Sequence, residues 1–290
     1  MLLTLAASCL KPLLALPGAR GKRAAGKMDI LDLPAFTRDT LGLTGLNLST
    51  DLLTGSDRTR LEAFRDRADR ASCSCLLLVE SEAQPLGGDS DAEGAASRER
   101  LLRVVEAAHL LGCTAAAVRV QSPDSETALA RVAQRLKPVM ERAERLDVNL
   151  LISPMAGLTE RPERVTELLK KVGGFRVGTF PDFEAASKAK DPATYLHRLT
   201  PYATVVSAST QRLEPATKKA GEASVEAFRE GAWVHQPYDL KVMVNAIRSV
   251  GYDGPLAIDY RGSEDVTIGV SRSRDALHAL VGTDQLLEEP

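Results

Sequence analysis

The sequence of 290 residues has few aromatic side chains, no surplus of basic charge and no long apolar run. Aromatic residues make up 4% of it and the formal net charge is −2, so it offers neither a stacking platform for bases nor a basic field for nucleic acid or anionic lipid. No stretch is long and apolar enough to span a bilayer. We therefore expect no nucleic-acid partner, no membrane partner and a cytoplasmic location.

Cysteine is scarce as well, with Cys9, Cys73, Cys75 and Cys113 as the four thiols. They do not make a disulfide framework in a chain of this length, and the paired CxxC spacing of a Cys-rich zinc site is missing. We expect small, reduced, buried side chains at these positions. A Gly-rich dinucleotide fingerprint after the first strand is also absent, which counts against a Rossmann domain.

What the sequence does contain is a repeating unit of apolar strand, polar loop and amphipathic helix. Strands are expected at residues 43–48, 75–79, 115–120, 148–152, 175–180, 203–207 and 256–258. Helices are expected at 31–41, 58–71, 98–111, 126–145, 162–172, 191–199, 240–250 and 271–281. Such alternation predicts βαβ units around a parallel sheet, and seven units fit a closed (β/α)8-type TIM barrel better than an open sheet. Either the N-terminal segment supplies the eighth strand or the barrel is incomplete.

The barrel is expected to span residues 28–282, with a C-terminal tail at 283–290. Residues 1–27 are treated as an N-terminal extension, apolar up to residue 16 and basic from 18 onward. A signal peptide has a positive region before its apolar run, and none precedes this one. Three interpretations stay open: a poor export signal, an extension without fixed structure, or an upstream start with Met28 as the true first residue. We favour the last two, which leaves export by this segment open.

The most informative segment is Gly178-Thr179-Phe180-Pro181-Asp182-Phe183. An apolar run there ends in a proline followed by a carboxylate. Parallel strands buried on both faces read as continuous apolar runs, and barrel enzymes keep their chemistry at the carboxyl ends of such strands. The segment therefore predicts a buried barrel strand that delivers Asp182 to the mouth.

With this segment, the sequence resembles the xylose isomerase-like TIM barrels, the sugar phosphate isomerase/epimerase superfamily that also includes endonuclease IV. The resemblance runs from about residue 28 to 281. Its other parts are Val205-Val206-Ser207-Ala208, and Gly251-Tyr252-Asp253-Gly254 through Asp259-Tyr260-Arg261-Gly262. Members of that family usually end the last strand with Glu-Tyr-x-Gly and follow the proline-aspartate pair with Gly-Asn.

The resemblance implies a divalent metal, Mg or Mn, held by Glu, Asp, His and Glu at the carboxyl ends of the strands. Carried over by position, Asp182 matches the family Asp and Asp259 takes the place of the last Glu. Ser153 stands at the strand-four Glu position, and Ser207 or Ser209 falls near the position of the sixth strand's His. Asp182 and Asp259 are thus the predicted metal ligands, and two carboxylates with waters hold Mg weakly.

Other residues can complete such a site. His235, in a loop before the last βα unit, and Glu80, at a strand end, are candidate acid/base groups. Arg119, Arg261 and Ser153 are candidates for binding the substrate, because arginine pairs with phosphate or carboxylate bidentately. Competing interpretations are a surface histidine at 235, a buried ion pair for Arg119, and pairing of Arg261 with Asp259.

Two functions follow. The first is an isomerase or epimerase, metal-assisted, that moves a proton on a small sugar or polyol. The alternative is a catalytically degenerate barrel that binds a ligand or partner without turnover, which the serines at 153 and 209 favour. An abasic-site nuclease fits poorly, because that chemistry needs a histidine-rich metal cluster and the chain has four histidines. The expected partner is a small carbohydrate-like molecule.

Overall fold

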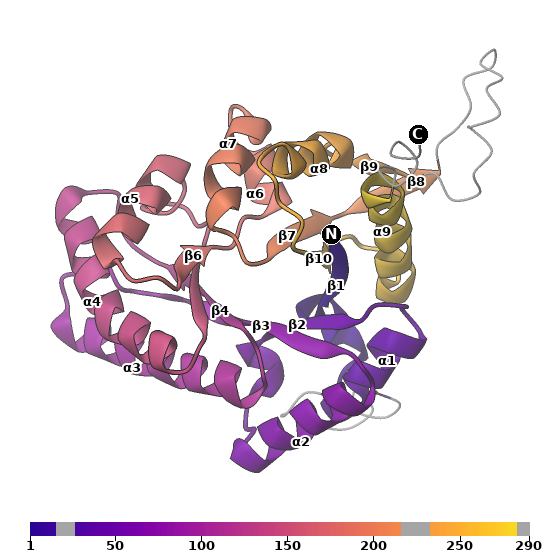
Figure 1. The fold of residues 1–290 in the computed structure, drawn as a ribbon, viewed down its shortest axis with the longest axis horizontal. Helices are drawn as coiled ribbons and strands as arrows, with labels where there is room; N and C mark the ends of the chain where they lie inside the picture. The colour runs from indigo at the N-terminus through magenta and orange to yellow at the C-terminus, as the bar shows by residue number, and fades with distance from the viewer. Residues whose placement is uncertain (16–26, 216–232, 283–290) are drawn as a thin grey trace.

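The computed structural model describes residues 1–15, 27–215 and 233–282, and in these ranges the chain forms a barrel of parallel strands ringed by helices (Figure 1). The sheet has eight strands in the order β6-β5-β4-β3-β2-β1-β10-β7. Their bounds are β1 (Leu2–Ala6), β2 (Gly45–Ser49), β3 (Ser74–Gln84), β4 (Ala115–Val120), β5 (Asn149–Ser153), β6 (Val177–Thr179), β7 (Val206–Thr210) and β10 (Pro255–Tyr260). Two isolated parallel bridges, Thr179 with Ala203 and Asp182 with Ser207, join the two ends of the sheet.

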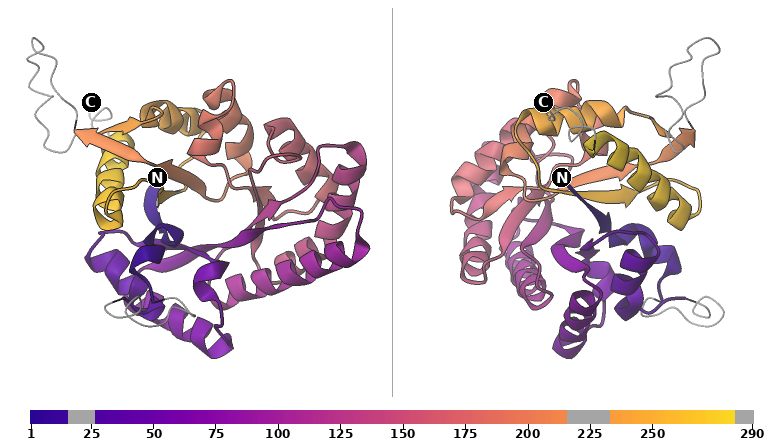
Figure 2. Two further views of the ribbon diagram at one scale, coloured as in Figure 1. Left: turned by 180° about the vertical axis from the view of Figure 1, so that it is seen from behind. Right: turned by 45° about the vertical axis from the view of Figure 1, so that its right-hand side comes forward.

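Helices cover the outside of the barrel, as the view from behind in Figure 2 also shows. They are α1 (Leu33–Asp39), α2 (Arg58–Arg70), α3 (Asp91–Leu110), α4 (Glu126–Arg145), α5 (Pro162–Val172), α6 (Phe183–Ser187), α7 (Pro192–Leu199), α8 (Leu240–Ser249) and α9 (Val266–Val281). Each long helix buries one face; α4 buries the apolar row that includes Leu129, Val132 and Leu136. None of the helices in the described ranges has the length and apolarity to cross a membrane.

The predicted TIM barrel is confirmed, and the seven expected strands each correspond to one of β2–β7 and β10. The eighth strand is β1, which pairs with β10 on one side and with β2 on the other. The expectation that residues 1–27 lie outside the barrel is therefore wrong for this segment. The apolar run at residues 2–6 forms a barrel strand because β10 and β2 lie parallel to it on its two sides and both form backbone hydrogen bonds with it. Residues 16–26 and the tail 283–290 lie outside the described residues.

Two further differences come from local chemistry. Helix α3 begins at Asp91, seven residues before the expected start, because the Ser90 hydroxyl accepts a hydrogen bond from the Glu93 amide and caps the helix. Between β7 and α8, β8 (Arg212–Pro215) pairs antiparallel with β9 (Trp233–Gln236). This hairpin lies against α9, and the residues between its strands are outside the described ranges.

The inside of the barrel is filled by small and medium apolar side chains, among them Leu77, Ala115, Ala117, Leu151, Val205 and Ala257. Successive side chains of a strand point to opposite faces. The next inward positions along β4, β5 and β10 are therefore Arg119, Ser153 and Asp259. Polar side chains thus follow directly on an apolar barrel interior, at the carboxyl ends of the strands.

Strand β6 is short because Pro181 has no amide hydrogen to continue the ladder. The carbonyl of Pro181 still accepts from the amide of Ser207 at 2.8 Å, which ties the strand end to β7. Asp182 then caps α6, its Oδ1 accepting from the amide of Ala185 at 2.8 Å. The Pro-Asp pair therefore ends a strand, closes the barrel and starts a helix.

Gly178 in β6 has no room for a side chain: an added Cβ would lie 2.4 Å from the carbonyl oxygen of Tyr202 and 3.0 Å from Leu151. We expect Gly178→Ala to lower the free energy of unfolding by about 1–3 kcal/mol through overpacking. Gly88→Ala is the matched control, because its Cβ would meet nothing closer than 3.8 Å. Urea denaturation measures both; equal losses in the two variants would contradict this account of the β6–β7 junction.

Candidate functional site

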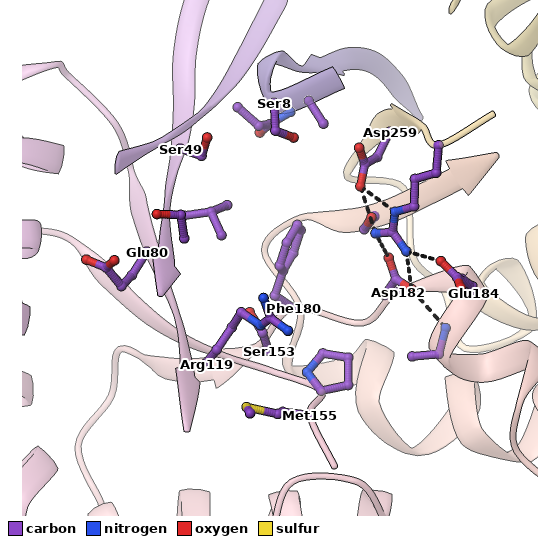
Figure 3. A pocket seen from close by; sticks show the side chains of 18 of the residues that line it. Ser8, Ser49, Glu80, Arg119, Ser153, Met155, Phe180, Asp182, Glu184 and Asp259 are labelled. Carbon is purple, nitrogen blue, oxygen red and sulfur yellow. Dashed lines mark hydrogen bonds and ion pairs between the residues drawn. The ribbon is translucent and has the colours of Figure 1, made fainter. Parts of the chain in front are cut away.

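A cavity of about 640 Å³ opens at the carboxyl ends of the barrel strands. Its wall includes Ser49 from β2, Arg119 from β4, Ser153 from β5, Asp182 after β6 and Asp259 from β10 (Figure 3). These side chains come from segments far apart in the sequence. The parallel barrel brings them to one rim, as expected for a fold whose active sites lie at this face.

The most connected group in the cavity wall is the guanidinium of Arg261. Its Nε donates to Asp259 at 2.9 Å, and Nη2 donates to Asp259 at 2.7 Å and to Asp182 at 2.6 Å. Its Nη1 donates to Asp182 at 3.3 Å and to Glu184 at 2.5 Å. Guanidinium carries five N–H donors, and these five bonds engage all of them. Arg261 therefore has no donor left for a ligand, which argues against the predicted role in substrate binding.

The charges of this cluster shift one another. Burial raises the pKa of the Asp259 carboxyl, although Arg261 beside it acts in the opposite direction. Hydrogen bonds from Lys188 and then Arg261 lower the pKa of Glu184. For Arg261 burial opposes the charged form, but the carboxylates of Asp182 and Asp259 outweigh it and raise its pKa. The cluster holds three carboxylates against the two cations Arg261 and Lys188.

Asp182 and Asp259 converge, as predicted, but on a guanidinium. Within the described ranges no group of three or more His, Cys, Asp or Glu side chains is arranged to hold a metal ion. Both oxygens of Asp182 and Oδ2 of Asp259 already accept from Arg261. The residues present therefore do not fit the divalent metal that the resemblance implied.

Arg119 is the opposite case. Its side chain lies at the inner face of β4 in the cavity wall, and no ion pair or hydrogen bond joins it to any part of the chain that the structure describes. Two polar atoms of residues in the wall, Ser153 Oγ on the neighbouring strand β5 and Asn47 Oδ1 on β2, are buried and lack a hydrogen-bond partner among the described residues. Buried polar atoms without a partner cost free energy, and these two have almost no accessible surface, so neither atom faces the open space of the cavity directly. Of the predicted substrate-binding residues, the structure brings Arg119 and Ser153 together.

Glu80 lines the cavity, but its carboxylate is fully buried and directed away from the Arg261 cluster (Figure 3). It accepts from Arg100 Nε at 2.7 Å, from Thr50 Oγ1 at 3.1 Å and from the Glu82 amide at 3.0 Å. These contacts tie the end of β3 to α3 and to the segment after β2. They leave Glu80 poorly placed for proton transfer in the cavity.

His235 is not among the residues that line the cavity. It lies in β9, its Nε2 accepts from the Gln211 amide at 2.8 Å, and its Nδ1 lies 2.8 Å from the Tyr238 carbonyl. That pattern makes Nδ1 the protonated nitrogen of a neutral ring. Burial lowers its pKa. The structure thus gives His235 the position of a hairpin anchor, apart from the acids it was expected to assist.

Sequence reasoning overlooked Asn47, Glu184 and Lys188 as parts of this wall. The spacing of Glu184 and Lys188 was a usable signal, because residues four apart on a helix form ion pairs, and these two are 2.7 Å apart. An asparagine inside an apolar strand was a signal for Asn47. Neither spacing nor strand pattern predicts that Glu184 reaches Arg261.

Comparison with protein families gives a match to the xylose isomerase-like TIM barrel model over residues 39–280. The chain belongs to the xylose isomerase-like TIM barrel family. No curated protein sequence matches it.

Solved structures with the same fold include D-psicose 3-epimerase in the presence of D-fructose (13% identity, TM-score 0.69, 100% of both chains covered). Others are 3-keto-D-glucoside 4-epimerase from E. coli (13%, 0.67, 97% of this chain and 99% of that one) and the IolI protein with a zinc atom (13%, 0.70, 98% and 99%). At these identities the likeness shows the fold, while the site residues have to be argued from this chain.

The position of His235 predicts a pH effect on stability. Because burial lowers its pKa in the folded state, the unfolded chain binds the proton more readily, and stability falls as pH drops below about 6.5. The variant His235→Gln has no imidazole to protonate, so its stability lacks this pH dependence. The wild type should lose part of its advantage in free energy of unfolding over the variant as pH falls from 7.5 to 5. Urea denaturation at both pH values measures it. His109→Gln, at an exposed position, is the control; a difference that is constant with pH would contradict the buried, neutral ring.

Proposed function

We propose that the chain binds a small polyhydroxylated anion, a sugar phosphate or sugar carboxylate, in the cavity at the carboxyl end of the barrel. The observation that carries this proposal is the side chain of Arg119. It is a permanent cation in a cavity wall, without a partner in the described ranges. An arginine in such a position pairs with a carboxylate or phosphate in bidentate fashion.

The rest of the wall suits hydroxyl groups. Asp259 Oδ1 has no hydrogen-bond partner among the described residues, while its Oδ2 accepts from Arg261. Ser153 lies in the same wall, on the strand next to Arg119. A ligand with its anion on Arg119 then presents hydroxyl donors to the acidic side of the cavity. A volume of about 640 Å³ is of the size that small-molecule pockets have.

The relatives support a carbohydrate-like ligand. The similar solved structures are described as epimerases of D-psicose and of a 3-keto-D-glucoside, and one was solved in the presence of D-fructose. The chain shares their fold and has a cavity of its own at the barrel mouth. Arg119 adds the preference for an anionic group.

Matched ligand pairs test the anion: D-fructose with D-fructose 6-phosphate, and D-glucose with D-gluconate. We expect isothermal titration to show tighter binding of an anionic member than of its neutral partner. Arg119→Gln should weaken that binding about 10- to 100-fold, because a hydrogen bond to a charged group is worth about 1.5–3 kcal/mol.

Arg103→Gln is the control, since Arg103 lies on the exposed face of α3 and pairs with Glu99. It should bind like wild type. Equal affinity for neutral and anionic sugars, or an Arg119→Gln variant with wild-type affinity, would contradict the proposal.

A second candidate function is isomerase- or epimerase-type proton transfer on the bound ligand, and Asp259 favours it. Its carboxyl is largely buried, with a side chain 17% exposed, its pKa is raised by burial, and Oδ1 is free to take a proton. A general base works best when its pKa approaches the working pH. In this role Asp259 takes a proton from the carbon next to a ligand carbonyl and returns it to the same or the neighbouring carbon. The alternative, a barrel that binds without turnover, needs no such step.

Exchange of carbon-bound protons decides between turnover and binding alone. We expect wild type to exchange protons at C1 or C3 of D-fructose 6-phosphate with D₂O, followed by NMR. Asp259→Asn should slow this exchange about 10²- to 10⁴-fold, the range of general-base contributions. Asp253→Asn, whose side chain lies outside the cavity, is the control. Absence of exchange in wild type that binds the ligand would favour the degenerate barrel.

A further inference from the structure

We infer that Arg261 takes the place of a divalent cation between Asp182, Glu184 and Asp259, so that the barrel mouth carries its own permanent cation and a metal site opens only when the guanidinium is removed. This inference concerns the metal preference of the cluster. It is independent of the proposed ligand and of turnover.

The geometry of the bonds carries the first step. Nη2 of Arg261 lies 2.6 Å from Asp182 Oδ2 and 2.7 Å from Asp259 Oδ2, and Nη1 lies 2.5 Å from Glu184 Oε2. Oxygen ligands surround Ca²⁺ at about 2.3–2.6 Å and Mg²⁺ at about 2.0–2.1 Å. Nη2 thus stands where a cation shared by Asp182 and Asp259 would have to stand, while Glu184 meets the other nitrogen, Nη1.

The local backbone holds the side chain in this position. The amide of Arg261 donates to the Thr210 carbonyl at 2.7 Å, so β7 fixes the end of β10. At Gly262 an added Cβ would lie 2.2 Å from Tyr260 Oη and 2.6 Å from the Gln211 carbonyl, which leaves room for glycine alone. The chain therefore turns directly after Arg261, and the side chain folds back over Asp259, two residues earlier.

Competition between the two cations favours the arginine. Its guanidinium stays protonated at any pH the fold tolerates, and all five of its N–H groups are satisfied by the three carboxylates. A metal ion from solution has to displace these five bonds and shed its own water, which Mg²⁺ does reluctantly. Without Arg261, three carboxylates remain with Lys188 as their one cation in the cluster.

Titration with Mn²⁺ tests the inference, read by calorimetry and by the EPR signal of free Mn²⁺. Wild type should bind no Mn²⁺ in the cavity at concentrations up to 1 mM. Arg261→Ala should bind one Mn²⁺ at least tenfold more tightly than wild type, and Arg261→Ala combined with Asp259→Asn should lose that binding.

Arg119→Ala is the matched control: it removes an arginine from the same cavity, but one without a carboxylate partner in the described ranges. It should gain no Mn²⁺ site. Arg261→Met keeps most of the side-chain volume and serves where the alanine variant is poorly folded by circular dichroism; its melting temperature should rise on addition of Mn²⁺.

Two results would overturn the inference. One is Mn²⁺ binding to wild type that Asp182→Asn abolishes, because the carboxylates would then serve a metal in the presence of Arg261. The other is a folded Arg261→Ala or Arg261→Met variant that binds no Mn²⁺. If neither Arg261 variant folds, the titration of wild type and of Asp182→Asn still tests whether the carboxylates bind Mn²⁺ in the presence of Arg261.

Discussion

The bond network between one guanidinium and three carboxylates sets the chemistry of the barrel mouth. Arg261, at the end of β10, holds Asp182 and Glu184 after β6 and Asp259 two residues before itself. The sheet begins with β6 and ends with β7, and isolated bridges between these two ends close the barrel. Because β10 lies next to β7, the bonds from Arg261 to the residues after β6 cross this line of closure. Charges of opposite sign in a partly buried place stabilise one another, and breaking such a network leaves uncompensated charge.

This network divides the cavity into two unlike sides. On one side the three acids are paired with Arg261 and Lys188, and Oδ1 of Asp259 has no hydrogen-bond partner among the described residues. On the other, Arg119 stands at the end of an inner face made of alanines, with Ser153 on the neighbouring strand. Small side chains below leave the arginine without a partner from the barrel interior. The cavity therefore has an acidic side and a basic side. This asymmetry suits the ligand that we propose, which carries a negative charge at one end.

The fold is shared with solved sugar epimerases, yet the described residues of this chain do not fit the divalent metal that the resemblance implied. Ser153 stands where the resemblance implied a glutamate, and Arg261 engages Asp182 and Asp259, the two carboxylates that the resemblance named as ligands. Fold and function separate at this point, because a barrel scaffold tolerates changes at its rim without changes in its core. Glu80 and His235 illustrate the same separation: both sit at plausible positions in the sequence and both have their polar atoms engaged by structural partners.

The sequence by itself determined the alternation of strands and helices, the parallel barrel and the delivery of Asp182 to its mouth, because apolar runs, helical periodicity and the Pro-Asp break are local signals. It also marked Asp182, Asp259, Arg119 and Ser153 as rim residues, since they end predicted strands. Only the tertiary structure decided that Leu2–Ala6 is the eighth barrel strand, because a short apolar run becomes a strand when neighbours pair with it. Only it decided which arginine is paired and which is free, because that depends on distances between side chains that the sequence places far apart.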